Sequence, residues 1–242
     1  MQKAVLLAGG KGTRMYPLTQ YIPKALLPIG MKPSIQLIAE EAILAGAKKI
    51  CFVVAPNSGV REYFEGCCKE IETFRGIELV FVTQNKPLGS GNALLCAEEF
   101  CQKEKFFLAN CDEVFSQNSF SQLLEANNIA VAIKKVKASQ CGLYGIVDCQ
   151  QGFAKNVQEK PDKISGSFGD ALVGRFLLDS RIFDCLRHVS FVNGEQRLTD
   201  ALKILFSQNK VSAVSLKGER FDVGNPSGYQ SAFCYFSLRK KR

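Results

Sequence analysis

The sequence predicts a three-layer α/β fold with a mainly parallel central sheet and a more antiparallel C-terminal half. Through the first half of the chain, short apolar runs alternate with helical patterns, which is typical of a parallel sheet covered on both faces. From residue 129 onward, strand-like runs are separated by short turns and fewer helices. The chain has 242 residues, 46% of them hydrophobic, which is enough for one large globular domain.

The elements of the first half follow from the spacing of apolar residues. Short apolar runs predict strands, and apolar residues three and four positions apart predict helices. We expect strands at 4–7, 49–55, 77–83 and 105–109, and helices at 34–45, 60–70, 91–100 and 119–127. Ligands bind at the carboxyl ends of strands in such sheets, so the loops at 9–12, 84–91 and 110–112 should share one rim.

The second half is predicted from shorter runs. We expect strands at 129–136, 144–148, 156–159, 172–178 and 211–216, and helices at 199–207 and 227–238. No internal repeat, low-complexity segment or linker interrupts the chain. We therefore expect a single domain, 1–242, with two halves at about 1–128 and 129–242.

A glycine-rich loop follows the first predicted strand. Gly9, Gly10 and Gly12 lack side chains, so backbone N–H groups can approach an anion closely. Arg14 and Lys24 add positive charge soon after the loop. This order predicts a phosphate-binding loop, although an ordinary glycine turn with two solvated cations would show the same local pattern.

Two common phosphate motifs do not match this loop. The P-loop requires a lysine followed by Ser or Thr after its last glycine, whereas Lys11 precedes Gly12. The dinucleotide fingerprint requires a glycine where Met15 stands.

Polar residues follow two further predicted strands. An amide such as Gln84, beside the backbone of Gly89, can bind the polar edge of a base, although a plain loop is the simpler interpretation of these residues alone. Asp112 ends the fourth strand, where a carboxylate facing a polyphosphate could hold Mg²⁺. A turn that terminates the strand is the alternative for Asp112.

Composition and charge limit the classes of ligand and the cellular compartment that we expect for this protein. The net charge is +8, but the basic residues are dispersed apart from 239–242, where we expect a solvated helix end. This favours small anionic ligands over nucleic acid. No apolar run is long enough for a membrane span, and the apolar stretch near the N-terminus is too short for a secretory signal. The ten cysteines lack zinc spacing, which predicts reduced thiols in a cytoplasmic protein.

The segment 7–28 resembles the signature of sugar-nucleotide pyrophosphorylases, nucleotidyltransferases that join a sugar 1-phosphate to a nucleoside triphosphate. Their G-x-G-T-R-x-x-P-x-T loop and P-K-x-L-L-P segment are complete at 10–19 and 23–28. Similar family segments are Y-G-I-V-D at 144–148, E-K-P at 159–161, L-T-D-A at 198–201 and D-V-G-N-P-S-G-Y at 222–229. The resemblance covers nearly the whole chain and implies a Rossmann-like nucleotidyltransferase fold.

The resemblance also implies a role for each motif residue. The first half would bind the nucleotide and the second half the sugar. The implied catalytic cations are Arg14, Lys24 and Lys160, and Asp112 and Asp222 are the implied ligands of a Mg²⁺ cofactor. The implied nucleotide-binding residues are Ala8, Gly9, Gly10, Gly12, Thr13, Gln84 and Gly89, and the implied sugar-binding residues are Gly145, Glu159 and Leu172. Taken alone, the E-K-P triplet would be interpreted as a solvated turn.

The downstream segments look most like the family members that use UTP and glucose 1-phosphate. The opening L-A-G-G-K-G-T-R is closer to the thymidylyl- and guanylyltransferases, and the chain is short between residues 64 and 77 for the uridylyl group. A glucose-1-phosphate thymidylyltransferase and a non-catalytic sugar-nucleotide-binding subunit are therefore the alternatives. His188, the one histidine, lies outside every motif, so no histidine-dependent nucleophile is expected. We expect a homo-oligomer.

Overall fold

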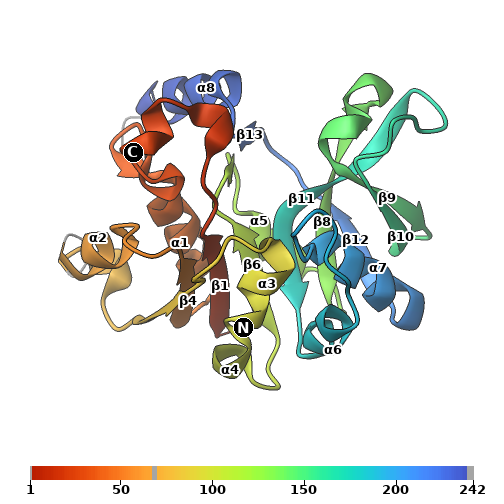
Figure 1. Cartoon of the computed structure of the whole chain (residues 1–242), viewed down its shortest axis with the longest axis horizontal. Coiled ribbons are helices and arrows are strands. Elements are labelled where there is room, and N and C mark those ends of the chain that lie inside the picture. The colour runs from red at the N-terminus through yellow and green to blue at the C-terminus, as the bar shows by residue number, and fades with distance from the viewer. Residues whose placement is uncertain (1, 67–69, 239–242) are drawn as a thin grey trace.

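The computed structural model describes residues 2–66 and 70–238 and is built around a nine-stranded mixed sheet (Figure 1). The strand order is β5-β4-β1-β6-β11-β8-β12-β10-β9. In chain order these strands are β1 (Lys3–Ala8), β4 (Lys49–Val54), β5 (Glu78–Thr83), β6 (Phe106–Asn110), β8 (Ala130–Lys137), β9 (Gly145–Gln150), β10 (Phe153–Glu159), β11 (Phe168–Leu178) and β12 (Val211–Ser215). Two short antiparallel pairs lie outside the sheet: β2 (Pro28–Ile29) with β3 (Lys32–Pro33), and β7 (Glu113–Phe115) with β13 (Arg220–Asp222).

Helices cover both faces of the sheet, which makes three layers (Figure 1). The helices α1 (Ser34–Leu44), α2 (Val60–Gly66), α5 (Ser119–Leu124) and α8 (Pro226–Leu238) contribute to one hydrophobic core. The helices α3 (Ser90–Leu95), α4 (Glu98–Cys101), α6 (Arg181–Arg187) and α7 (Leu198–Gln208) contribute to the other. Short 3-10 helices lie at Thr13–Met15, Leu18–Gln20, Lys24–Leu26, Glu72–Phe74 and Ala138–Leu143.

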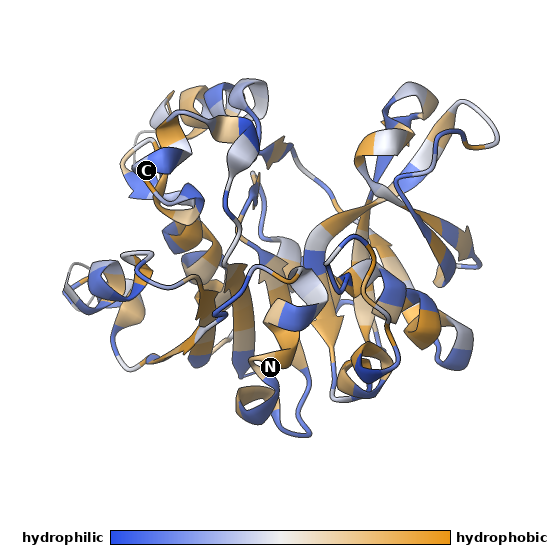
Figure 2. Ribbon diagram, in the orientation of Figure 1, coloured by the Kyte–Doolittle hydropathy of each residue, from blue (hydrophilic) through white to orange (hydrophobic). Residues whose placement is uncertain are grey.

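The strands β1, β4 and β6 consist mainly of apolar residues because both of their faces are buried. In β1, Ala4 and Leu6 belong to one core and Val5 and Leu7 to the other, as the two-residue period of a strand requires. Figure 2 shows these hydrophobic strands between helices that carry both hydrophobic and hydrophilic residues. The apolar run that predicts the first strand is therefore the signature of a strand with helices on both sides.

The sheet changes direction where its two halves meet. β5, β4, β1 and β6 run parallel to one another. β11 then pairs antiparallel with β6 on one side and with β8 on the other. β8 and β12 are parallel, whereas β10 pairs antiparallel with both β12 and β9. The predicted α/β class, with a parallel first half and a more antiparallel second half, is confirmed.

Several predicted elements differ from the structure. The helix predicted at 91–100 is two short helices, α3 and α4, and the predictions missed α6 altogether. The strands β10 and β11 begin earlier than predicted, at Phe153 and Phe168. The pairing of β7 with β13 was also not predicted. The helix predicted at 60–70 is described as α2 over Val60–Gly66, and residues 67–69, like the basic segment 239–242, lie outside the described residues.

The described cysteines are free thiols, most of them buried. Burial raises the pKa of Cys51 and of Cys111 to about 12, so both remain protonated at neutral pH. Within 2–66 and 70–238, no helix is both long enough and apolar enough to cross a membrane.

Candidate active site

The glycine loop leaves β1 at the carboxyl edge of the parallel strands. A Cβ atom on Gly9 would lie 2.9 Å from Gln84 Oε1, so a larger residue would collide with the neighbouring loop. Gly12 has a φ of 67°, which favours glycine, and a Cβ atom there would lie 3.0 Å from Lys24 Cβ. The hydroxyl of Thr19 donates to the Gly12 carbonyl at 2.7 Å and holds the turn. The loop is therefore packed closely against Gln84 and against the segment that carries Thr19 and Lys24.

Cations and carboxylates from opposite ends of the chain meet beside this loop. Lys24 Nζ donates to Asp112 Oδ2 at 2.8 Å. Arg14 lies between two carboxylates, with Nη2 at 4.0 Å from Asp112 Oδ2 and Nη1 at 3.7 Å from Asp222 Oδ2. The side chain of Lys24 is only 13% exposed, whereas that of Arg14 is 59% exposed. Arg14 can therefore reorient toward an incoming anion more easily than Lys24 can.

The cations keep Asp112 ionised. Burial acts to raise the pKa of this carboxyl, but the Lys24 ammonium, through its charge and its hydrogen bond, and the Arg14 guanidinium outweigh burial, so the pKa lies below its ordinary value. A carboxylate that is fully charged at neutral pH can bind a cation without first losing a proton.

The loop after β13 closes over these charged groups. Gly224 N–H donates to Asp222 Oδ1 at 2.9 Å, and Val223 N–H donates to the Asp112 carbonyl at 2.8 Å. A Cβ atom on Gly224 would lie 2.6 Å from Lys24 Nζ and 2.8 Å from Arg14 Nη2. Glycine at this position leaves the room that both cations occupy.

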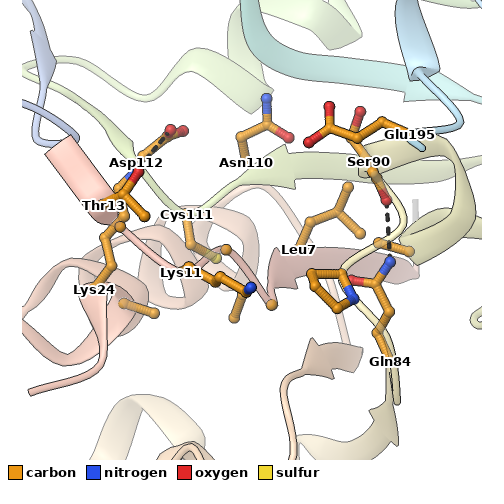
Figure 3. A pocket seen from close by; sticks show the side chains of 18 residues that line it. Leu7, Lys11, Thr13, Lys24, Gln84, Ser90, Asn110, Cys111, Asp112 and Glu195 are labelled. Carbon is orange, nitrogen blue, oxygen red and sulfur yellow. Dashed lines mark hydrogen bonds and ion pairs between the residues drawn. The ribbon is translucent and has the colours of Figure 1, made fainter. Parts of the chain in front are cut away.

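A first cavity of about 510 Å³ lies behind the glycine loop (Figure 3). In Figure 3 Lys24 and Asp112 lie at one end of this cavity and Gln84 at the other. Gln84 Nε2 donates to the Gly89 carbonyl at 3.1 Å and to Asn92 Oδ1 at 3.0 Å, so the amide orients the loop that lines the cavity. Of the predicted site residues, this cavity is lined by Ala8, Gly9, Gly10, Gly12, Thr13, Lys24, Gln84, Gly89 and Asp112.

A second cavity, of about 470 Å³, lies over the antiparallel half. Lys160 Nζ lies 3.9 Å from Glu159 Oε1, and the lysine side chain is 60% exposed. A Cβ atom on Gly145 would lie 3.4 Å from Glu159 Oε2, so the glycine backbone forms an open wall beside the carboxylate. Of the predicted site residues, this cavity is lined by Arg14, Asp112, Gly145, Glu159, Lys160, Leu172 and Asp222.

The two cavities share the side chains of Ser90, Asn110 and Asp112. Every predicted site residue lines one cavity or the other, and Asp112 lines both. A ligand in the first cavity and a ligand in the second can therefore meet at Asp112, beside Lys24 and Arg14.

Several lining residues were not predicted from the sequence. Ser90 and Asn110 stand next to motif residues, so their neighbourhood in the sequence was a usable signal. Glu195 enters the first cavity because the loop 89–91 packs against the next residue, Gln196. Gly91 N–H donates to the Gln196 carbonyl oxygen at 2.9 Å, and a Cβ atom on Gly89 would lie 2.6 Å from that oxygen. No local pattern marks Glu195.

The fold and the site together define an α/β enzyme of the nucleotidyl-transferring class. The chain belongs to the nucleotidyl transferase family, whose model matches residues 3–237. The predicted family is thereby confirmed.

Relatives and solved structures are similar over almost the full chain. The chain is 33% identical to the UTP–glucose-1-phosphate uridylyltransferase of Mycoplasma genitalium, over all of this chain and 93% of that protein. It is 31% identical to the enzyme of the same name from Haemophilus ducreyi, over 99% of this chain and 94% of that protein. A UDP-glucose pyrophosphorylase complexed with UDP-glucose superposes with a TM-score of 0.87 at 28% identity, covering 99% of this chain and all of that one. The UTP-bound enzyme from Acinetobacter baumannii gives 0.86 at 25% identity, covering 100% and 95%.

Proposed function

We propose that the chain joins UTP and glucose 1-phosphate to give UDP-glucose and pyrophosphate. The observation that carries this proposal is the meeting of the two cavities at Asp112. One cavity has a phosphate-type glycine loop at its edge, and the other has a carboxylate and a lysine at 159 and 160. The similar proteins named for this reaction, and the related structures with UDP-glucose and UTP bound, support the choice of substrates.

In this proposal UTP occupies the first cavity. The backbone of Gly9, Gly10, Gly12 and Thr13 would donate to the phosphates, because a glycine loop exposes its N–H groups. Ala8, Gln84 and Gly89 would bind the uracil. Since Gln84 Nε2 already donates within the protein, Oε1 is the atom of this amide that we assign to the base, where it would accept from the ring N–H.

Glucose 1-phosphate would occupy the second cavity. Glu159 would accept hydrogen bonds from sugar hydroxyls, and the backbone of Gly145 would allow close approach of the ring. Leu172 would form the wall against the sugar. Lys160 would pair with the sugar phosphate. Its ammonium is largely exposed, and it would have to give up only a 3.9 Å contact with Glu159 to bind the phosphate.

The chemistry requires positioning and charge neutralisation rather than a base. A sugar phosphate with a second pKa near ~6 is largely dianionic at neutral pH, so one of its oxygens can attack the α-phosphorus directly. That bond forms as the bond from the α-phosphorus to the bridging oxygen breaks, and pyrophosphate leaves in line. We assign Lys24 to the reacting phosphate, Arg14 to the leaving phosphates and Lys160 to the incoming phosphate, each neutralising charge that builds up in the transition state.

The residues around Arg14 fit a magnesium ion. Asp112 and Asp222 both approach Arg14, and carboxylate oxygens are ligands that Mg²⁺ prefers. Mg²⁺ usually takes one or two protein carboxylates together with phosphate oxygens and waters, so two aspartates suffice. Bound there, the ion would supply electrostatic stabilisation of the phosphate oxygens.

We also retain three wider expectations as proposals. The continuous sheet supports one domain, 1–242, with a nucleotide-binding half at about 1–128 and a sugar-binding half at about 129–242. The free thiols support a cytoplasmic location. The third is a homo-oligomer, which light scattering during size-exclusion chromatography would test.

Pyrophosphate release, measured across four nucleoside triphosphates and several sugar 1-phosphates, tests the proposed reaction. We expect UTP with glucose 1-phosphate and Mg²⁺ to give the highest kcat/KM, and Asp112→Asn to reduce it sharply. Faster turnover with dTTP would identify a thymidylyltransferase instead. Binding of UDP-glucose without turnover of any substrate pair would identify a regulatory subunit.

A further inference from the structure

A buried ion pair joins Glu113 to Arg220, two residues that are close in sequence to Asp112 and Asp222 respectively. Arg220 donates from Nη2 to Glu113 Oε1 at 2.7 Å and from Nε to Oε2 at 3.0 Å, so the guanidinium contacts the carboxylate as a fork. Gly174 N–H donates to Glu113 Oε2 at 2.9 Å. Both charged side chains are only 11% exposed, and both line the second cavity.

This pair joins β7, which directly follows Asp112, to β13, which ends at Asp222. Glu113 immediately follows Asp112 and begins β7, and Arg220 and Asp222 are the first and last residues of β13. In the antiparallel pairing Asp222 lies opposite Glu113. The Val223 amide then donates to the Asp112 carbonyl at 2.8 Å. Three residues on each strand make the pairing, so side-chain contacts must contribute much of its order.

The same guanidinium contacts the wall of the second cavity. Arg220 Cζ lies 4.8 Å from the centre of the Tyr144 ring. The Tyr144 carbonyl accepts from the Lys160 amide at 3.0 Å, and Tyr144 precedes Gly145 in the chain. Arg220 therefore contacts Tyr144, which precedes the proposed sugar-binding Gly145 and is hydrogen-bonded to Lys160, the residue assigned to the sugar phosphate.

We propose that Glu113 and Arg220 are positioning residues of the nucleotidyl-transfer site. Their ion pair sets the separation of Asp112 and Asp222 and orients the Tyr144 segment of the sugar cavity. This inference rests on the proposed function for the identity of the ligands. Burying two charges is costly even when they are paired, so a buried pair is weak evidence for a stabilising role alone. Its place on the two short strands adjoining Asp112 and Asp222 provides a reason for it to be there.

The test uses Arg220→Lys and Glu113→Gln in the full chain. Lysine keeps the charge but loses both the fork and the planar contact with Tyr144. For each variant we expect the KM for glucose 1-phosphate to rise about tenfold or more, with a lower kcat, because charge-assisted contacts are lost. UTP binding measured by calorimetry in EDTA should stay within about twofold, since neither residue lines the first cavity. The Mg²⁺ concentration for half-maximal rate should rise.

A readout that needs no turnover accompanies the kinetics. Hydrogen exchange of the Val223 amide should be about tenfold faster in both variants, because this amide spans the two segments that the pair joins. The matched control is Glu40→Gln, which removes a partly buried ion pair with Lys32, 2.6 Å from Nζ to Oε2, outside both cavities. The control should change neither Val223 exchange nor the substrate constants.

The outcomes separate the two proposals. Variants with a lower melting temperature but wild-type KM, kcat and Val223 exchange would show a purely structural pair and overturn the inference. If Glu113→Gln does not fold, Arg220→Lys alone tests the inference, and wild-type KM, kcat and Val223 exchange in that variant would overturn it. If the wild-type protein makes no UDP-glucose, the proposed function fails, whereas Val223 exchange still decides whether the pair holds the aspartate segments together.

Discussion

Gly224→Ala places one methyl group among the three charged side chains at the centre of the site. The new Cβ atom would lie 2.6 Å from Lys24 Nζ, 2.8 Å from Arg14 Nη2 and 2.9 Å from Asp222 Oδ1. Gly224 does not have a left-handed backbone, so alanine adds bulk without backbone strain. The substitution therefore tests the positions of the charged groups and little else.

The geometry sets the size of the expected effect. Ordinary contact begins near 3.4 Å, so Lys24 Nζ must retreat by about 0.8 Å. Arg14 is exposed and can move aside, but Lys24 is confined, with its Cβ atom against Gly12. A misplacement near 1 Å in a reacting constellation costs about 100-fold, so we expect kcat to fall roughly 30- to 100-fold. The free energy of unfolding should change by less than about 1 kcal/mol, because the displaced atoms are the ends of flexible side chains.

The assay is pyrophosphate release under saturating UTP and glucose 1-phosphate, with thermal unfolding measured in parallel. Gly66→Ala is the matched control, because a Cβ atom there meets no atom of the described residues within 4 Å and Gly66 lines neither cavity. The control should retain wild-type kcat and stability. A Gly224→Ala enzyme with wild-type kcat would refute the assignment of Lys24 and Arg14 to the reacting phosphates.

Four further predictions follow from the same site. Lys160→Ala should raise the KM for glucose 1-phosphate and lower kcat, at a cost of about 2–3 kcal/mol or roughly 30- to 200-fold in kcat/KM, with UTP binding little changed; equal weakening of both substrates in steady-state kinetics would place the residue elsewhere. Arg14→Lys keeps the charge but loses the planar fork, so kcat/KM for UTP should still fall clearly, and full activity would reduce Arg14 to a general field effect. Asp112→Asn and Asp222→Asn should each weaken Mg²⁺-dependent UTP binding in calorimetry and slow turnover. The double variant should lose little more activity than the worse single variant, whereas fully additive losses would show that the two residues act separately. The wild-type enzyme should prefer UTP and accept dTTP poorly, because a site that hydrogen-bonds the ribose 2′-hydroxyl rejects its absence; a higher kcat/KM for dTTP would contradict this.

Local chemistry made much of the fold predictable. A strand buried on both faces must be apolar throughout, and that requirement identified β1, β4 and β6 to within a residue or two. Helix periodicity located α1 and α7 equally well. Where local patterns are short, the predictions failed: α6 has only seven residues, and β7 and β13 have three each. Elements of this length are stabilised by their neighbours rather than by their own sequence.

Part of the candidate site could likewise be predicted from local sequence, and part could not. The glycine loop could be interpreted from its own residues, because close backbone approach demands glycine whatever the rest of the chain does. The pairing of Asp112 with Asp222 came from a family resemblance, since no local property links residues so far apart. The structure brings both aspartates to Arg14, and their roles stay predictions.

The sequence by itself determined the main alternation of longer strands and helices, the phosphate-type loop and the family, because each depends on spacings of a few residues. Only the tertiary structure decided which side chains meet. Glu195 reaches the first cavity because Gln196 is held by the loop that contains Gly91, and Glu113 meets Arg220 because β7 pairs with β13. Such contacts depend on sheet register and loop packing between distant segments, which the residues on either side of each position do not encode.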